Sequence, residues 1–149
     1  MGKITLSLEI GASPEKVFNL LDDLDKLNEI TKGVVKNTVI SQTPNVVGSI
    51  GHTILYNKSG GIQAEFDMEI TEYEKNKKVS MHTIGKSKMK ANIKYVFEPT
   101  AMGTKLIKTT EYELPYSIIG KIIDKISVHK EMEKMDEKLL NDAKKVLEA

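Results

Sequence analysis

The three histidines are the residues of this chain best suited to proton transfer, because an ordinary imidazole pKa of about 6.5 allows both protonation states near neutral pH. His129 falls on the apolar face of a predicted helix, and His52 falls in a predicted strand. Each is a candidate general acid or base, with Tyr112 as a partner that orients a ligand oxygen. Each also has a structural alternative, as a histidine at the edge of a packed face that bonds a backbone carbonyl or water. His82 has the opposite parity to the apolar residues of its strand, so we expect it to be exposed.

The spacing of these residues gives no support to metal or cofactor chemistry. The chain has three histidines but no H-x-x-x-H pair, and its cysteine count is zero. A zinc site needs three or four converging ligands, and thiolate ligands or nucleophiles need cysteine. We therefore predict no metal site and no cofactor.

A predicted strand near the end of the chain contributes further polar groups. One register of this strand turns Leu106, Lys108, Thr110, Tyr112 and Leu114 to the same face, with three apolar members against one in the other register. We therefore expect Lys108, Thr110 and Tyr112 to face inward. A lysine in a dry cavity has a depressed pKa and can form a Schiff base with a carbonyl ligand. The arrangement that we favour instead buries the stem of Lys108 at the cavity mouth and leaves its ammonium in water.

The composition limits the partners of the chain. Its 149 residues fit one domain, predicted to span 1–149, and a formal net charge of +1 provides no general attraction to nucleic acid or to an anionic membrane. All basic residues are lysine, so the planar guanidinium that grips phosphate is missing. No apolar run approaches the roughly 20 residues needed to cross a bilayer, and the first ten residues lack the layout of a signal peptide. We expect a cytoplasmic protein without nucleic-acid partners or stable membrane insertion.

Strand patterns occupy the chain between two helical regions. Residues 3–10 alternate polar and apolar side chains, as a half-buried strand does, and Ser13-Pro14 then opens two short helices that end at Lys32-Gly33. Six further strands follow, separated by turn residues: roughly Val34–Ser41, Ser49–Asn57, Ile62–Tyr73, Lys78–Ile84, Lys88–Phe97 and Thr104–Leu114. Their short connections predict an antiparallel meander.

The last element is a predicted helix over Tyr116–Leu147. Its mostly apolar stripe recurs at three- and four-residue steps: Ile119, Ile122, Ile126, His129, Met132, Met135, Leu139, Ala143 and Val146. A helix of this length extends about 45–50 Å, so it must lie across a broad sheet. We expect Ile122, Ile126, His129 and Met132 to line a pocket, and Leu139, Ala143 and Val146 to pack below it as ordinary core.

Several segments resemble those of a known family. The opening strand followed by ASPEKVFNLLDDLDKL is similar to the start of the polyketide cyclase/dehydrase and lipid-transport proteins of the START-related (SRPBCC) superfamily. FEPTAMGTKLIKTTEYELP is similar to their late hairpin, and GKIIDKI through EKLLNDAKKVLE is similar to their C-terminal helix. The tryptophan that many relatives carry after the short helices is missing, and Asn28-Glu29-Ile30 stands in that region.

The resemblance implies an α+β helix-grip fold: a curved antiparallel sheet of about seven strands wrapped around a long C-terminal helix, with two short helices between strands 1 and 2. It also implies an apolar cavity between sheet and helix for a small hydrophobic molecule, such as a lipid, quinone, sterol or polyketide. Sheet-face parity and the helical stripe then predict the residues that contact this ligand: Ile54, Tyr56, Phe66, Met68, Met89, Ile93, Tyr95, Lys108, Thr110, Tyr112, Ile122, Ile126, His129 and Met132.

Three functions fit this interpretation. The first, which we favour, is an intracellular carrier or sensor of the hydrophobic ligand. The second is a cyclase, dehydratase or hydrolase-like enzyme that uses His129 or His52 together with a tyrosine. The third is a protein-interaction module. The sequence leaves the identity of the ligand and the oligomeric state open.

Overall fold

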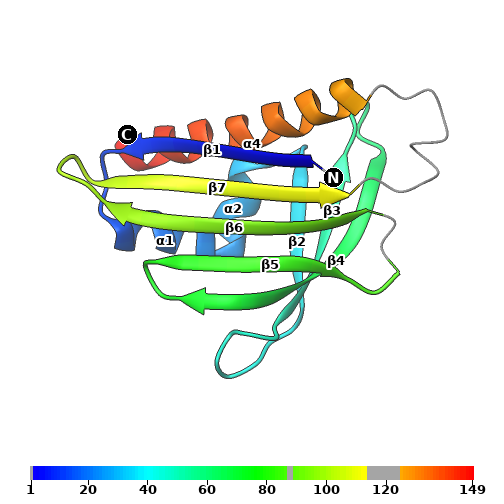
Figure 1. Cartoon of the computed structure of the whole chain (residues 1–149), viewed down its shortest axis with the longest axis horizontal. Coiled ribbons are helices and arrows are strands. Elements are labelled where there is room, and N and C mark those ends of the chain that lie inside the picture. The colour runs from blue at the N-terminus through cyan, green and yellow to red at the C-terminus, as the bar shows by residue number, and fades with distance from the viewer. Residues whose placement is uncertain (1, 87–88, 114–124) are drawn as a thin grey trace.

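One curved sheet of seven antiparallel strands forms the frame of the molecule (Figure 1). The computed structural model describes residues 2–86, 89–113 and 125–149. The strands are β1 (Gly2–Ile10), β2 (Val35–Ser41), β3 (Ile50–Tyr56), β4 (Ile62–Glu74), β5 (Lys78–Ile84), β6 (Lys90–Pro99) and β7 (Thr104–Glu113). Their order is β1-β7-β6-β5-β4-β3-β2, so β2 to β7 form the predicted meander and the first strand pairs with the last.

Two short helices follow β1, and the first begins at Ser13-Pro14, as the sequence predicts. The side chain of Ser13 accepts a hydrogen bond of 3.3 Å from the first turn of α1 (Pro14–Asp22). The carboxylate of Asp23 accepts a bond of 3.0 Å from the Asp25 amide at the start of α2 (Leu24–Ile30). These bonds satisfy amide groups that have no partner within the helix, which fixes where each helix begins.

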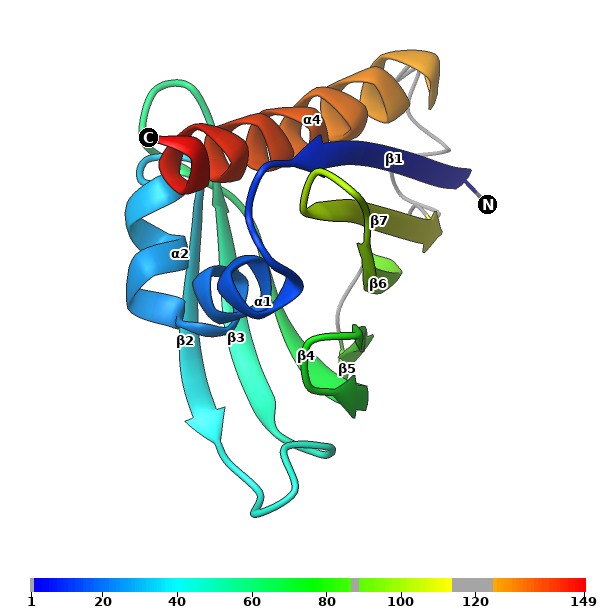
Figure 2. The ribbon, with the colours of Figure 1, turned by 90° about the vertical axis from the view of Figure 1, so that its left-hand side faces the viewer.

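The long C-terminal helix, α4 (Lys125–Glu148), completes the predicted helix-grip arrangement. Figure 2 shows α4 running along β1, while α1 lies on the concave side of the curved sheet. The predicted helix begins earlier, at Tyr116, but residues 114–124 lie outside the described part of the chain, and Ile122 with them.

The main core lies where α1 and α4 meet the concave side of the sheet, which we call the inner face. Phe18 of α1 is 1% exposed, and its ring makes edge-to-face contacts with Tyr73 (centroids 5.5 Å apart) and Phe97 (5.2 Å). Leu106 and Leu140 belong to the same buried cluster. Aromatic pairs in this geometry contribute beyond their buried area, so α1 is firmly attached to the sheet.

The sequence predicts that Ile54 of β3 faces inward, toward the ligand, and this prediction is wrong. Thr53 pairs with the buried Phe66 of β4, so it is Thr53 that faces inward, while His52 and Ile54 turn to the outer face. The hydroxyl of Thr53 donates a 2.7 Å hydrogen bond to the side-chain oxygen of Asn37 on β2, so this buried polar group has a partner. Sheet-face parity favoured the other face because this polar contact cannot be seen in the sequence pattern.

The buried stripe of α4 also differs from the predicted one. Ile126 is 64% exposed and Val146 is 52% exposed, so both expectations of burial are wrong. Asp136 and Leu140 are buried instead, at 4% and 3%. The sequence stripe ran through Met135 because it excluded a charged residue, and the helix is in fact rotated to bury that carboxylate.

Replacing Phe18 with alanine tests the attachment of α1. We expect Phe18→Ala to lower the free energy of unfolding by about 3–5 kcal/mol, because the change removes buried area and leaves a cavity. Urea denaturation followed by circular dichroism measures the loss. The matched control is Met102→Ala, at a side chain that is 73% exposed, which should change stability by less than about 0.5 kcal/mol. Equal effects of the two variants would contradict this account of the core.

Candidate functional site

A row of three polar side chains on β7 faces α4. The ammonium of Lys108 lies 2.6 Å from Oδ1 of Asp136, and the hydroxyl of Thr110 donates to Oδ2 of the same carboxylate at 2.9 Å. The side chains of Lys108 and Asp136 are only 8% and 6% exposed, so this is a buried ion pair. Further along, the Tyr112 hydroxyl lies 2.6 Å from Nδ1 of His129. The predicted inward register of β7 is therefore correct.

The prediction that the Lys108 ammonium lies in water is wrong, because the side chain is only 8% exposed. Burial lowers the pKa of this group, but the neighbouring Tyr95 and the Asp136 carboxylate outweigh it, so the pKa lies above its ordinary value. The ammonium also lies 5.5 Å from the centre of the Tyr95 ring. A lysine held protonated in this way is unsuited to Schiff-base formation, which needs the free amine.

The Tyr112–His129 contact brings together the two residue types that acid–base chemistry would use. Tyr112 is 6% exposed, and burial raises the pKa of its phenol, which therefore stays protonated at neutral pH. Nε2 of His129 lies 3.7 Å from Glu133, one turn further along α4. The His129 side chain is 36% exposed, so one side of the pair remains open to solvent.

The other histidines lie on the opposite side of the sheet. Nδ1 of His52 is 2.7 Å from Asp67 and its Nε2 is 3.6 Å from Glu65, both on β4. His82 pairs with Glu69 at 3.3 Å and is 41% exposed, in agreement with the outward position that the sequence predicts. His52 therefore cannot join His129 at one site, and it is no longer a catalytic candidate for chemistry on the inner face.

The remaining predicted contact residues divide into a buried and a half-buried group. Phe66 and Met68 are buried on the inner face, while Ile93 and Tyr95 of β6 are half-buried there, and Met132 of α4 packs against the buried Ile4 and Tyr112. Met89 is half-buried between β5 and β6. Tyr56 lies beyond a register shift at the end of β3, opposite Ile62, and it is also half-buried.

Asp136 is the site residue that sequence reasoning missed. A signal was present, because Met132, Asp136, Leu140 and Ala143 follow the same three- and four-residue steps as the predicted stripe. An inward-facing lysine also requires a carboxylate partner, since buried charges are almost always paired. Searching the facing helix for that partner would have identified Asp136.

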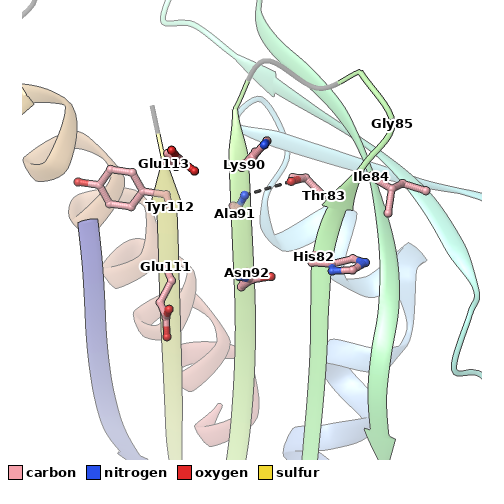
Figure 3. Close-up of a pocket in the computed structure, with 10 residues that line it drawn as sticks. All are labelled: His82, Thr83, Ile84, Gly85, Lys90, Ala91, Asn92, Glu111, Tyr112 and Glu113. Carbon is pink, nitrogen blue, oxygen red and sulfur yellow. Dashed lines mark hydrogen bonds between the residues drawn. The ribbon is translucent and has the colours of Figure 1, made fainter. Parts of the chain in front are cut away.

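A hollow of about 310 Å³ opens where β5 and β6 separate (Figure 3). The last paired residues there are His82 and Asn92, and beyond them the Ala91 amide donates to the Thr83 hydroxyl at 3.1 Å. The hollow is lined by His82, Thr83, Ile84, Gly85, Lys90, Ala91, Asn92, Glu111, Tyr112 and Glu113. His82, Asn92 and Glu111 of this lining share the outer face of the sheet, and the Tyr112 ring points away from the hollow in Figure 3, so the hollow lies outside the polar row on β7.

Two negative findings concern the described residues only. Within 2–86, 89–113 and 125–149, no group of three histidine or acidic side chains is arranged to hold a metal ion. In the same ranges, no helix is both long enough and apolar enough to span a membrane.

Solved structures with this arrangement come from several bacteria. A protein of Thermus thermophilus superposes with a TM-score of 0.81 at 23% identity, over 97% of this chain and 95% of that one. The Aha1 dimer of Colwellia psychrerythraea gives 0.69 at 21% identity, over 99% and 96%. The di-domain ARO/CYC StfQ of the steffimycin biosynthetic pathway gives 0.78 at 15% identity, and the match covers 98% of this chain but 50% of that one. These likenesses show the fold.

The curved sheet, the helix along it and the mixed inner face define a protein of the helix-grip class. A comparison with curated protein sequences finds no match. The family model described as polyketide cyclase/dehydrase and lipid transport matches residues 1–148. The chain therefore belongs to the polyketide cyclase/dehydrase and lipid-transport family, as the sequence resemblance indicated.

Removing one member of the buried ion pair tests its energetics. Asp136→Ala leaves the Lys108 ammonium buried without a countercharge, so we expect a loss of about 3–5 kcal/mol in the free energy of unfolding. The double change Lys108→Met/Asp136→Leu replaces the pair by apolar groups and should be near neutral, or stabilising by up to about 4 kcal/mol. Urea titrations of both variants make the comparison. Asp142→Ala, one to two turns further along α4, is the control, and a double variant as unstable as the single one would contradict the prediction.

The outer-face histidine predicts a pH dependence of stability. The hydrogen bond to Asp67, with a smaller contribution from Glu65, raises the pKa of His52 above its ordinary value of 6.5, although partial burial opposes the shift. The stabilisation is therefore complete below about pH 6.5 and is lost as the pH rises through the raised pKa. We expect His52→Gln to cost roughly 0.2–1 kcal/mol at pH 5.5 and less at pH 8.5. Denaturation at both pH values measures this, and in an Asp67→Asn background the pH dependence of the substitution should become smaller, with only the contribution of Glu65 left.

Proposed function

We propose that this chain binds a small hydrophobic molecule, of the lipid, quinone, sterol or polyketide-like kind, on the inner face of the sheet beside α4. One observation carries the proposal. Apolar side chains in the middle of the inner face, including Leu55, Ile70, Val79, Met81 and Ile93, are half-buried where a sealed core would bury them fully. Ligand sites combine such apolar walls with a few polar groups, and the row on β7 supplies those groups.

Family membership supports the same proposal from an independent direction. The family description joins cyclases and dehydrases with lipid-transport proteins, and binding of an apolar molecule is the property that these activities share. The ion pair of Lys108 and Asp136 and the contact of Tyr112 with His129 provide polar positions beside the apolar wall. A carrier or sensor needs only this binding. A cytoplasmic location is part of the proposal, and cell fractionation tests it.

The contact between Tyr112 and His129 favours a second candidate, a cyclase or dehydratase. In this mechanism the protonated Tyr112 phenol donates to a ligand carbonyl, and His129 takes up or returns the proton of a neighbouring carbon. The 2.6 Å separation lets the two groups exchange a proton directly. With 2,6-heptanedione as a probe, aldol closure and loss of water give a cyclohexenone whose absorbance can be followed. Loss of turnover in both Tyr112→Phe and His129→Ala would support the enzyme, and no turnover by the unaltered chain would contradict it for this class of substrate.

Paired substitutions on β6 test the binding proposal. Ile93 lies in the middle of the inner face, between Thr110 and Met81 on the neighbouring strands, whereas the preceding residue, Asn92, is exposed on the outer face. We expect Ile93→Phe to weaken binding of the neutral fluorophore 2-lauroyl-6-dimethylaminonaphthalene about tenfold, or roughly 1.4 kcal/mol, because the added ring occupies the ligand position. The matched control Asn92→Phe should leave the affinity unchanged.

The same titrations include the outcomes that oppose the proposal. Equal weakening by the two substitutions would place the probe outside the inner face. Failure of the unaltered chain to bind this fluorophore, a fatty acid, a quinone or a sterol, together with no co-purifying small molecule by native mass spectrometry, would show that the binding proposal is wrong.

A further inference from the structure

The polar groups on the inner face are arranged as neutral pairs, and this limits the ligands that the face accepts. Lys108 and Asp136 carry opposite charges 2.6 Å apart, and Tyr112 is bonded to His129. Among the described residues, the one buried side-chain atom without a hydrogen-bond partner is Oδ1 of Asn76, which lies in the β4–β5 turn away from this row. The ion pair of the row therefore presents no uncompensated charge, and none of the row's fully buried side-chain atoms lacks a hydrogen-bond partner.

From this balance we infer that the ligand is an uncharged molecule bearing a carbonyl or hydroxyl oxygen, and that carboxylates such as fatty acids are excluded. The inference rests on the proposed binding function and names the chemical class of its ligand. It separates ketones, quinones and sterols from the anionic lipids that an apolar wall alone would also accept.

The electrostatic argument depends on the position of Asp136. A carboxylate that approached Lys108 would also approach Asp136, so attraction to the ammonium would be largely cancelled by repulsion from the carboxylate. Moving a carboxylate out of water is costly unless it gains a countercharge. Among the described strand residues, Lys108 is the one lysine on the inner face, and Asp136 already balances its charge, so no lone cation of these strands compensates that cost.

A neutral oxygen faces no such penalty, and Tyr95 provides a donor for it. The Tyr95 ring lies beside the Lys108 ammonium, with its centroid 5.5 Å from the nitrogen. A phenol O–H can donate a hydrogen bond to a carbonyl oxygen or accept one from a hydroxyl, without carrying a charge. Tyr95 is half-buried beside Ile93 on the same face, so a carbonyl that accepts this proton would have its apolar body against the inner face.

The test compares two fluorophores that differ in charge but share a ring system, 2-acetyl-6-dimethylaminonaphthalene and 6-dimethylamino-2-naphthoate. We expect the ketone to bind the unaltered chain at least ten times more tightly than the carboxylate at pH 7.5. Asp136→Asn leaves the charge of Lys108 uncompensated, so this variant should bind the carboxylate more tightly and reduce the preference at least tenfold. Asp142→Asn is the matched control, because that carboxylate pairs with Lys138 on the same helix, and it should keep the original preference.

A second variant keeps the inference testable if Asp136→Asn does not fold. Lys108→Met/Asp136→Leu removes both charges and keeps the face neutral, so it should retain the preference for the ketone. Equal or tighter binding of the carboxylate by the unaltered chain would overturn the inference and leave the binding function intact. Retention of the full preference by a folded Asp136→Asn variant would overturn it as well. Binding of neither fluorophore, nor of any member of the panel above, would overturn the binding function and this inference together.

Discussion

The ion pair between Lys108 and Asp136 fixes how the long helix sits on the sheet. Once Asp136 is placed opposite β7, the helix cannot rotate without leaving a buried charge unpaired. His129 lies seven residues earlier, which is two helical turns and about 10 Å along α4. Tyr112 lies four residues beyond Lys108, about 13 Å along a strand that runs in the opposite direction. The second contact, of Tyr112 with His129, therefore follows from the first.

Buried ion pairs contribute little net stability, so the value of this one lies in specificity of packing. The apolar core around Phe18, Phe97 and Leu140 would tolerate small rotations of α4, because dispersion contacts are not directional. A carboxylate that must meet both an ammonium and the Thr110 hydroxyl has one acceptable position. The same polar contacts that align the helix also determine the electrostatic character of the face beneath it.

The sequence predicted those parts of the fold that are positioned by apolar side chains or by local turn and cap residues. The alternation in β1, the start of α1 at Ser13-Pro14, the meander of β2 to β7 and the register of β7 are of this kind. The predicted inward faces of β3 and α4 were wrong, because Thr53 and Asp136 are buried and form hydrogen bonds to residues distant in the sequence. A polar residue that is paired across the fold resembles an exposed one in a hydrophobicity pattern, and only the tertiary structure supplies its partner.

The core is distributed unevenly across the sheet, and this affects how the molecule opens. Fully buried residues concentrate in β1, α1, β7 and the second half of α4, whereas α2 and β2 contain none. Local opening costs little free energy where few apolar contacts must be broken, so backbone amides of β2 exchange with solvent through small fluctuations. Amides of β7 lie among buried side chains, so their exchange requires larger and more costly openings. The part of the sheet around β2 can therefore rearrange when a ligand binds, while the core around β1 and β7 keeps the fold intact.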